Sequence, residues 1–219
     1  MPAKRRSAAD YVPNASTLKG LRAAAARCRG CDLYKAATQT VFGDGAARAR
    51  VMFVGEQPGD HEDKEGRTFV GPAGKFLRAL LREAGIAESR VYFTNAVKHF
   101  KYIWRGKHRI HSKPKRLEVQ ACRPWLEAEI ALIRPEVIVT LGATASQALM
   151  GPSFRLTKHR GEFLPSPHAA HVMAMIHPSA ILRTPAAAAR AEETARFLSE
   201  LRIVARTLRD RPKRKTSNR

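Results

Sequence analysis

Apolar and polar positions along the chain follow two alternating patterns, short apolar runs and longer amphipathic stretches. The runs at 51–55, 91–97, 136–142 and 171–176 have the length and composition typical of buried strands. The stretches between them carry apolar residues at helical spacing. Strands that alternate with helices predict an α/β fold of the three-layer αβα type, with a central, mostly parallel four-stranded sheet. Helices are expected over residues 16–27, 74–84, 117–133, 143–150 and 186–208.

The two ends of the chain differ from its middle in composition. Residues 1–15 and 209–219 are basic, and we expect them to be a mobile tail and a disordered tail. Residues 16–208 contain the whole alternating pattern and show no internal repeat. The sequence therefore predicts a single α/β domain over residues 16–208.

Polar or small residues stand at the ends of all the predicted strands. They are Glu56, Asn95, Gly142 and His177. Carboxyl ends of parallel strands meet at one edge of a sheet, where α/β proteins bind ligands, so we expect these residues to converge. The alternative is a set of ordinary strand–loop connections with solvated polar side chains.

The charge of the chain points to a polyanionic partner. Forty Lys and Arg against 19 Asp and Glu give a formal net charge of +21, which favours nucleic acid first and an anionic membrane surface second. Residues 98–116 hold eight of these Lys and Arg, three His and no acidic residue. No apolar run is long enough to cross a bilayer and no signal peptide is recognisable, so we expect a soluble, cytoplasmic monomer.

Three cysteines, Cys28, Cys31 and Cys122, are too few and odd in number for a disulfide framework. The C-x2-C spacing of the first two lets both thiolates reach one metal centre. A reducing compartment and a bound metal or cluster are the favoured interpretation. The alternative is two structural cysteines that lie close by chance.

Four segments carry recognisable motifs: Gly55-Glu56-Gln57-Pro58-Gly59, Phe69-Val70-Gly71-Pro72-Ala73-Gly74, Thr94-Asn95-Ala96-Val97-Lys98 and His177-Pro178-Ser179-Ala180-Ile181-Leu182-Arg183. In this order they resemble the motifs of iron-sulfur uracil-DNA glycosylases. The likeness covers roughly residues 25–205 and implies the fold of that family, with uracil-containing DNA as partner, single-stranded and, as an open question, double-stranded. In a bacterium it implies an enzyme of DNA repair associated with the nucleoid.

The resemblance implies roles for the residues at the strand ends. Asn95 is expected to pair with the uracil edge and Phe69 to stack on the ring. His177 would hydrogen-bond the carbonyl of uracil that gains charge as the glycosidic bond breaks. Gly55 and Gln57 complete the expected uracil site. Phosphates of the DNA are expected to meet Arg105, Lys107, Arg109, Lys113, Ser179 and Arg183.

The segment Lys107-His108-Arg109-Ile110-His111 is similar to the basic loop of the UdgX branch, whose members become covalently joined to uracil-containing DNA through a histidine. The matching residue is His111, while His108 leaves open which histidine is better placed. A neutral imidazole is a good nucleophile, so capture of the sugar cation by His111 would end a single turnover. Glu56 would stabilise the cation, orient His111, or do both, and Gln57 would exclude water or hold His111.

Two other functions stay open at this point. One is an ordinary turnover glycosylase that activates water with Asp60 or Glu56 and releases a free abasic site. The other is a non-catalytic iron-sulfur protein that binds DNA and uses its cluster for folding or redox sensing.

The resemblance also implies a [4Fe-4S] cluster. Related glycosylases usually supply four cysteines, and His99 stands here where the third is expected. We therefore expect the ligands to be Cys28, Cys31, His99 and Cys122, since imidazole ligation of cluster iron occurs in Rieske centres. A structural zinc ion is the alternative, because three Cys and one His are an ordinary zinc ligand set.

Overall fold

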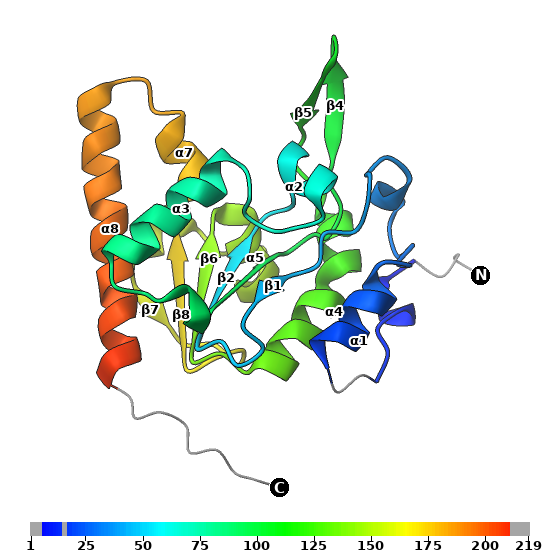
Figure 1. Ribbon diagram of the computed structural model, residues 1–219, viewed down its shortest axis with the longest axis horizontal. Helices are drawn as coiled ribbons and strands as arrows, with labels where there is room; N and C mark the ends of the chain where they lie inside the picture. Colours follow the sequence, from blue (N-terminus) through cyan, green and yellow to red (C-terminus); the bar gives the residue numbers. More distant parts are fainter. Residues whose placement is uncertain (1–5, 15–16, 211–219) are drawn as a thin grey trace, which may run out of the picture.

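The computed structural model describes residues 6–14 and 17–210. A six-stranded sheet in the order β1-β3-β2-β6-β8-β7 forms its centre (Figure 1). The four inner strands are parallel and the two edge strands are antiparallel to their neighbours. These strands are β1 (Asp44–Gly45), β2 (Val51–Gly55), β3 (Val91–Asn95), β6 (Val137–Leu141), β7 (Phe163–Leu164) and β8 (His171–Met175).

The predicted α/β fold and its four parallel strands are confirmed. The predicted strand count is too small for the whole sheet, because β1 and β7 extend its edges. Each of these strands has two residues, which is too short to leave an alternating pattern in the sequence. The sheet is therefore mostly parallel, as expected, with six strands in place of four.

Helices cover both faces of the sheet (Figure 1). One apolar core lies between the sheet and α3 (Pro72–Glu83), α7 (Pro178–Leu182) and α8 (Ala187–Asp210). A second lies between the sheet and α4 (Arg116–Ile133) and α5 (Ala143–Met150). A third, outer cluster joins α4 to α1 (Leu18–Ala25) and to η1 (Ala8–Asp10). The layering is that of the predicted αβα sandwich.

Most helix boundaries differ from the expected ones by a few residues. Helix α3 begins at Pro72, which suits the first helical position because its missing N–H would have no partner there. Helix α4 continues through Pro124 without a break. The short elements were not predicted at all: they are η2 (Asp32–Lys35), α2 (Asp60–Glu65), η3 (Glu88–Arg90), α6 (Leu156–His159), β4 (Tyr102–Arg105) and β5 (His108–His111).

The basic stretch expected as a loop contains a β-hairpin. Strands β4 and β5 pair antiparallel, and Gly106 takes a positive φ of 57° in the turn between them. The hairpin stands out from the body of the protein above α2 (Figure 1). The sequence places His111 at its base, on the last residue of β5.

The amino-terminal segment is part of the packed structure from an earlier point than residue 16. Ala8 is buried in the outer cluster, and Tyr11 and Val12 pack against it. Of the expected tails at 1–15 and 209–219, residues 1–5, 15 and 211–219 lie outside the described residues. The second tail was predicted to begin too early, because α8 continues to Asp210. Across residues 6–14 and 17–210, no helix combines the length and the apolar character that a membrane crossing requires.

A buried ion pair joins the inner helix α4 to the segment after β3. Lys98 Nζ lies 2.6 Å from Glu129 Oε2, and the two side chains are 1% and 0% exposed. Glu129 also accepts hydrogen bonds from the hydroxyls of Tyr92 and Thr94. Lys98 Nζ donates in addition to the carbonyl oxygen of Asn95 at 2.8 Å. The network satisfies both charges and fixes the end of β3.

Glu129→Gln should destabilise the protein by about 3–5 kcal/mol, because it leaves the ammonium of Lys98 buried without a counter-charge. The matched control is Glu127→Gln on the same helix, which breaks the exposed pair of Glu127 with Arg123. That change should cost less than about 0.5 kcal/mol. Chemical denaturation of the three proteins measures both differences, and equal midpoints would contradict the importance of the buried pair.

Candidate active site

A cavity of about 640 Å³ opens at the carboxyl edge of the parallel strands. It lies where α/β proteins bind ligands, beyond the ends of β2, β3, β6 and β8. The hairpin base and α7 contribute to its walls. The predicted site residues on its lining are Glu56, Gln57, Asp60, Phe69, Asn95, His111, Gly142, His177, Ser179 and Arg183.

Phe69 and Asn95 line this cavity, and Gly55 at the end of β2 packs tightly against both. A Cβ atom on Gly55 would lie 2.3 Å from Asn95 Oδ1 and 2.9 Å from Phe69 Cζ, so only glycine fits. Phe69 is buried, has an unusual φ of 55° and stacks at 6.5 Å between ring centres with His177. A flat apolar face beside one amide side chain suits a planar polar heterocycle.

The hydrogen bonds of His177 define its tautomer. Nδ1 accepts from the backbone N–H of Ser179 at 3.2 Å and lies 2.7 Å from Ser179 Oγ. Since an amide N–H can only donate, the proton of the neutral ring is on Nε2. Burial lowers the pKa of His177 to about 4, and the charges of Arg183 and His111 act in the same direction. His177 is therefore a neutral N–H donor near pH 7.

His111 and Glu56 face each other across the cavity wall. His111 Nε2 lies 3.3 Å from Glu56 Oε1, and the side chains are 48% and 22% exposed. Burial lowers the pKa of His111; the Glu56 carboxylate opposes this shift and Arg183 adds to it. The pair thus brings an imidazole that tends to be neutral into contact with a carboxylate.

Gln57 holds the two strands of the hairpin together at their base. Its Nε2 donates to the carbonyl oxygens of Lys101 at 3.0 Å and Ser112 at 3.2 Å. Its Oε1 accepts from the backbone N–H of Lys101 at 3.2 Å. Ser112 follows His111 directly, so the amide of Gln57 fixes the backbone on which that imidazole stands.

The side chain of Arg109 is largely buried, whereas a residue that contacts phosphates would be expected to be exposed. Its guanidinium is 10% exposed and bonds Asp60 Oδ1 at 2.6 Å and Asp63 Oδ2 at 2.7 Å. It also lies over the rings of Phe100 and Tyr102. The charge of Arg109 is therefore used inside the protein, where it ties the hairpin to α2.

The two carboxylate oxygens of Asp60 accept hydrogen bonds from two cations, Lys64 and Arg109. Burial would raise the pKa of Asp60, but hydrogen bonds from Lys64 and Arg109 outweigh it and lower that pKa. A carboxylate held in this way by two cations is a weak base for activating water. Asp63, which sequence reasoning missed, is fully buried and accepts from the backbone N–H of Thr38. The one feature of the sequence that could have indicated Asp63 is its place three residues after Asp60, on the same side of a helix.

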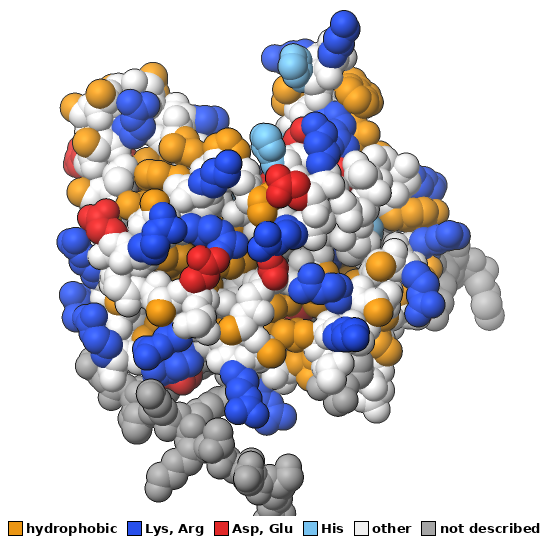
Figure 2. All heavy atoms as spheres, in the orientation of Figure 1, with side chains coloured by type: hydrophobic (Ala, Val, Ile, Leu, Met, Phe, Trp, Pro, Cys, Tyr) orange, Lys and Arg blue, Asp and Glu red, His pale blue; other side chains and the backbone are white. Residues whose placement is uncertain are grey.

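The remaining residues expected to contact phosphates divide into two groups. Arg105, Lys107 and Lys113 are exposed on or just beyond the hairpin. Arg183 and Ser179 lie on the opposite wall, where Arg183 Nη1 donates to Ser179 Oγ at 3.1 Å. Lys, Arg and His side chains gather along the projecting hairpin (Figure 2).

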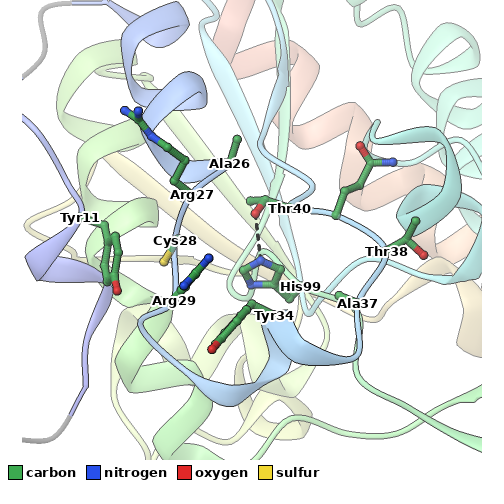
Figure 3. A pocket seen from close by; sticks show the side chains of 11 residues that line it. Tyr11, Ala26, Arg27, Cys28, Arg29, Tyr34, Ala37, Thr38, Thr40 and His99 are labelled. Carbon is green, nitrogen blue, oxygen red and sulfur yellow. Dashed lines mark hydrogen bonds between the residues drawn. The ribbon is translucent and has the colours of Figure 1, made fainter.

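A second cavity, of about 560 Å³, lies beside the amino-terminal segment and is lined by Cys28 and His99 (Figure 3). Thr40 Oγ1 donates its one hydrogen to the carbonyl oxygen of Ala25 and lies 2.8 Å from His99 Nε2. His99 Nε2 therefore carries the ring proton, which leaves Nδ1 as an acceptor. That nitrogen is buried and has no hydrogen-bond partner within the described residues. A histidine whose other nitrogen donates to the protein is the usual form of a metal ligand.

The three cysteines are free, and all of them belong to the outer cluster between α4 and the amino-terminal segment; Cys28 also lines the cavity. Burial raises the pKa of Cys122 to about 12, against the opposing charge of Lys98. Within residues 6–14 and 17–210, no three His, Cys, Asp or Glu side chains are grouped closely enough to hold a single metal ion. The ligands of a four-iron cluster stand farther apart than those of a single ion, because each of them binds a different iron atom.

Comparison with known proteins gives the family. The sequence model of the Uracil DNA glycosylase superfamily matches residues 42–202. The chain belongs to this superfamily. The Type-4 uracil-DNA glycosylase of Sulfurisphaera tokodaii is 36% identical over 184 residues, which cover 80% of each chain. The Type-4 enzyme of Thermotoga maritima is 40% identical over 158 residues, 72% of this chain and 79% of the relative. The Type-5 enzyme of Thermus thermophilus is 34% identical over 159 residues, 64% and 68% of the two chains.

In this member of the superfamily, Arg109→Gln should loosen the hairpin, because the anchor to Asp60 and Asp63 is lost. We expect backbone amides of residues 101–112 to exchange hydrogen at least about tenfold faster, as in other locally opened segments. Lys107→Gln, an exposed cation on the same hairpin, should leave exchange unchanged. Exchange followed by mass spectrometry compares the variants, and equal protection in both would show that Arg109 is not the anchor.

Proposed function

We propose that this chain is a uracil-DNA glycosylase that excises uracil from DNA and becomes covalently linked to the resulting sugar through His111. The observation that carries the proposal is the contact of His111 Nε2 with Glu56 Oε1, at 3.3 Å, on the wall of the cavity. The names of the Type-4 relatives support uracil excision. The covalent step is supported by the imidazole itself, which stands where a reacting sugar would enter.

Binding would begin with a uracil turned out of the base stack, because a stacked base cannot reach a cavity at the end of a sheet. Its ring would pack on Phe69, and the amide of Asn95 would pair with its polar edge. The absent side chain at Gly55 lets Asn95 and Phe69 come close together, so that both can contact the ring.

Cleavage of the bond between the sugar carbon C1′ and uracil N1 leaves the electron pair on uracil and positive charge on the sugar. The Nε2–H of His177 would donate to the uracil carbonyl that receives the negative charge, and its position is fixed in advance by Ser179. The Glu56 carboxylate would stabilise the sugar cation from the opposite side.

Capture by His111 completes the proposed reaction. A lone pair of the imidazole forms a new bond to C1′, and the ring then loses its remaining N–H proton to solvent or to the uracil anion. The products are neutral uracil and a sugar bonded to a neutral, alkylated imidazole. Uracil, the leaving group, can depart from the cavity, so nothing remains to reverse the bond.

Ordinary turnover is the second candidate, in which water takes the place of His111. Asp60 is poorly suited as its base, since Lys64 and Arg109 lower the pKa of that carboxyl. Glu56 remains available to either reaction. What favours capture is that Gln57 fixes the backbone next to His111, because its amide bonds the carbonyl oxygen of Ser112 at 3.2 Å and that of Lys101 on the other strand at 3.0 Å.

We further propose that Cys28, Cys31, His99 and Cys122 hold a [4Fe-4S] cluster. The unprotonated, unpartnered Nδ1 of His99 supports this ligand set within the described residues. The cluster's role would be structural, because its ligands would join the amino-terminal segment to the strand that leads into the hairpin. The chemistry of excision would be carried out by residues of the first cavity, Glu56, His111 and His177, and not by the cluster.

His111→Ala should abolish the covalent product while uracil release continues, because Glu56 and His177 still stabilise the charges and water can enter. Incubation with a uracil-containing oligonucleotide, followed by denaturing electrophoresis, detects the adduct as a shifted band and free abasic sites by alkaline cleavage. His108→Ala, on the same hairpin, is the control and should form the adduct normally. A shifted band with His111→Ala refutes the assignment, and no uracil release from any protein refutes glycosylase activity.

The purified protein should be brown and contain roughly four iron and four sulfide ions per chain, as the formula of a [4Fe-4S] cluster requires. His99→Ala should lose most of this iron, and His99→Cys should regain it, because a thiolate is the usual ligand at such a cluster. Metal analysis and visible absorption measure both. A colourless protein with one zinc ion would overturn the cluster in favour of a structural zinc site.

A further inference from the structure

Exposed apolar side chains concentrate on the hairpin. Among the described residues, five large hydrophobic side chains are exposed, and three of them are Ile103 (55%), Trp104 (63%) and Ile110 (40%). A two-stranded hairpin has no core of its own that could explain them. Their exposure beside the cavity raises the question of what covers them.

The two faces of the hairpin differ. Ile103 pairs with Ile110 in the register, and the next pair, Arg105 with His108, shares that face. We call these four residues the Ile face. The opposite face is docked on the protein near the base of the hairpin, where the hydroxyl of Tyr102 donates to the carbonyl oxygen of Ala36 at 3.1 Å. Trp104 shares that face but lies farther from the base and stays exposed. The docked contacts leave the Ile face free.

The Ile face is continuous with the candidate active site. Ile110 lines the same cavity as its neighbour His111. Because Ile110 and His111 both reach this cavity, the nucleotide next to a sugar held at His111 is the part of the strand that would meet Ile110 and its partner Ile103.

The charges around the Ile face select the partner. Arg105 and His108 border the apolar pair, and residues 98–116 contain no Asp or Glu. A second copy of a chain with a net charge of +21 would be repelled. An apolar patch edged by cations fits a nucleic-acid strand, whose bases present apolar faces and whose phosphates are anions.

We propose that the Ile face holds the nucleotide next to the uracil: Ile103 and Ile110 pack on its base, and Arg105 contacts its phosphate. The contact keeps the strand bent at the cavity and makes the enzyme sensitive to the neighbouring base. This inference rests on the proposed function, because it assigns a further contact to the same DNA.

The test couples a change in the protein to a change in the DNA. Single-stranded oligonucleotides carry uracil, and the base on its 5′ or its 3′ side is replaced by an abasic tetrahydrofuran, which keeps the phosphate. With wild-type protein, one of the two replacements should slow product formation about tenfold, as expected for the loss of one packed base. The double variant Ile103→Ala with Ile110→Ala should form product more slowly by a similar factor on the strand that has both neighbouring bases. On the strand that lacks the critical base, its rate should fall no further, because the contact is already absent.

The hairpin supplies matched controls. Trp104→Ala removes a more exposed side chain from the opposite face, and Leu117→Ala removes an exposed one (54%) from α4. Both should behave as wild type on all strands. The double variant Ile103→Leu with Ile110→Leu should again be slowed by loss of the neighbouring base, since leucine keeps the apolar surface.

Binding of the same strands with 2′-fluoro-deoxyuridine, whose glycosidic bond is stabilised, gives the readout without chemistry. If binding shows the coupling but no protein releases uracil, the proposed function fails and the Ile face stands. If uracil is excised and the isoleucine variants are slowed by loss of the neighbouring base as much as wild type, the proposal for the Ile face is wrong. It is also wrong if Trp104→Ala alone abolishes the sensitivity, or if the isoleucine variants only convert a dimer to a monomer in sedimentation.

Discussion

The buried guanidinium of Arg109 is the contact on which the candidate active site depends. It joins the hairpin to two carboxylates of α2, at 2.6 and 2.7 Å, with 10% of its side chain exposed. A planar guanidinium suits this position, because it can bond both carboxylates while it lies over aromatic rings, which an ammonium group does less well. Asp63 is fully buried, so the charges hold each other in place. Without them the base of the hairpin would be held by the amide of Gln57 and by neutral or more exposed contacts, such as that of the Tyr102 hydroxyl with the carbonyl oxygen of Ala36.

The segment between β3 and the hairpin connects the two candidate sites. Asn95 ends the strand, His99 lines the second cavity, and Phe100 packs at 5.2 Å from the ring of Tyr102 and 6.3 Å from that of His111. The buried pair of Lys98 and Glu129 fixes the middle of this segment. A group bound at His99 would therefore stiffen the backbone that carries the hairpin, a role that requires no electron transfer. This continuity is the physical reason for treating the proposed cluster as structural.

The sequence predicted the parallel sheet and the convergence of Glu56, Asn95 and His177, because buried strands leave long apolar runs and their ends define one edge. It did not predict the hairpin, since residues 102–111 are neither alternating nor apolar enough to indicate strands. For the same reason it treated Arg109 as a free cation. A lone basic residue in a basic stretch has no feature that distinguishes an internal anchor from a phosphate contact; only the tertiary position of Asp60 and Asp63 does so.

The proposed capture makes opposite demands on Glu56. Its negative charge stabilises the sugar cation, but the same charge raises the pKa of His111 and so favours the imidazolium, which has no lone pair to donate. Burial lowers that pKa and Arg183 lowers it further, and the balance of the three lies below the usual value for histidine. The arrangement thus favours the neutral imidazole beside a carboxylate whose charge, on its own, would favour the imidazolium. Arg183 therefore has a second role in the proposed reaction besides the proposed phosphate contact, because its charge lowers the pKa of His111 and favours the neutral ring.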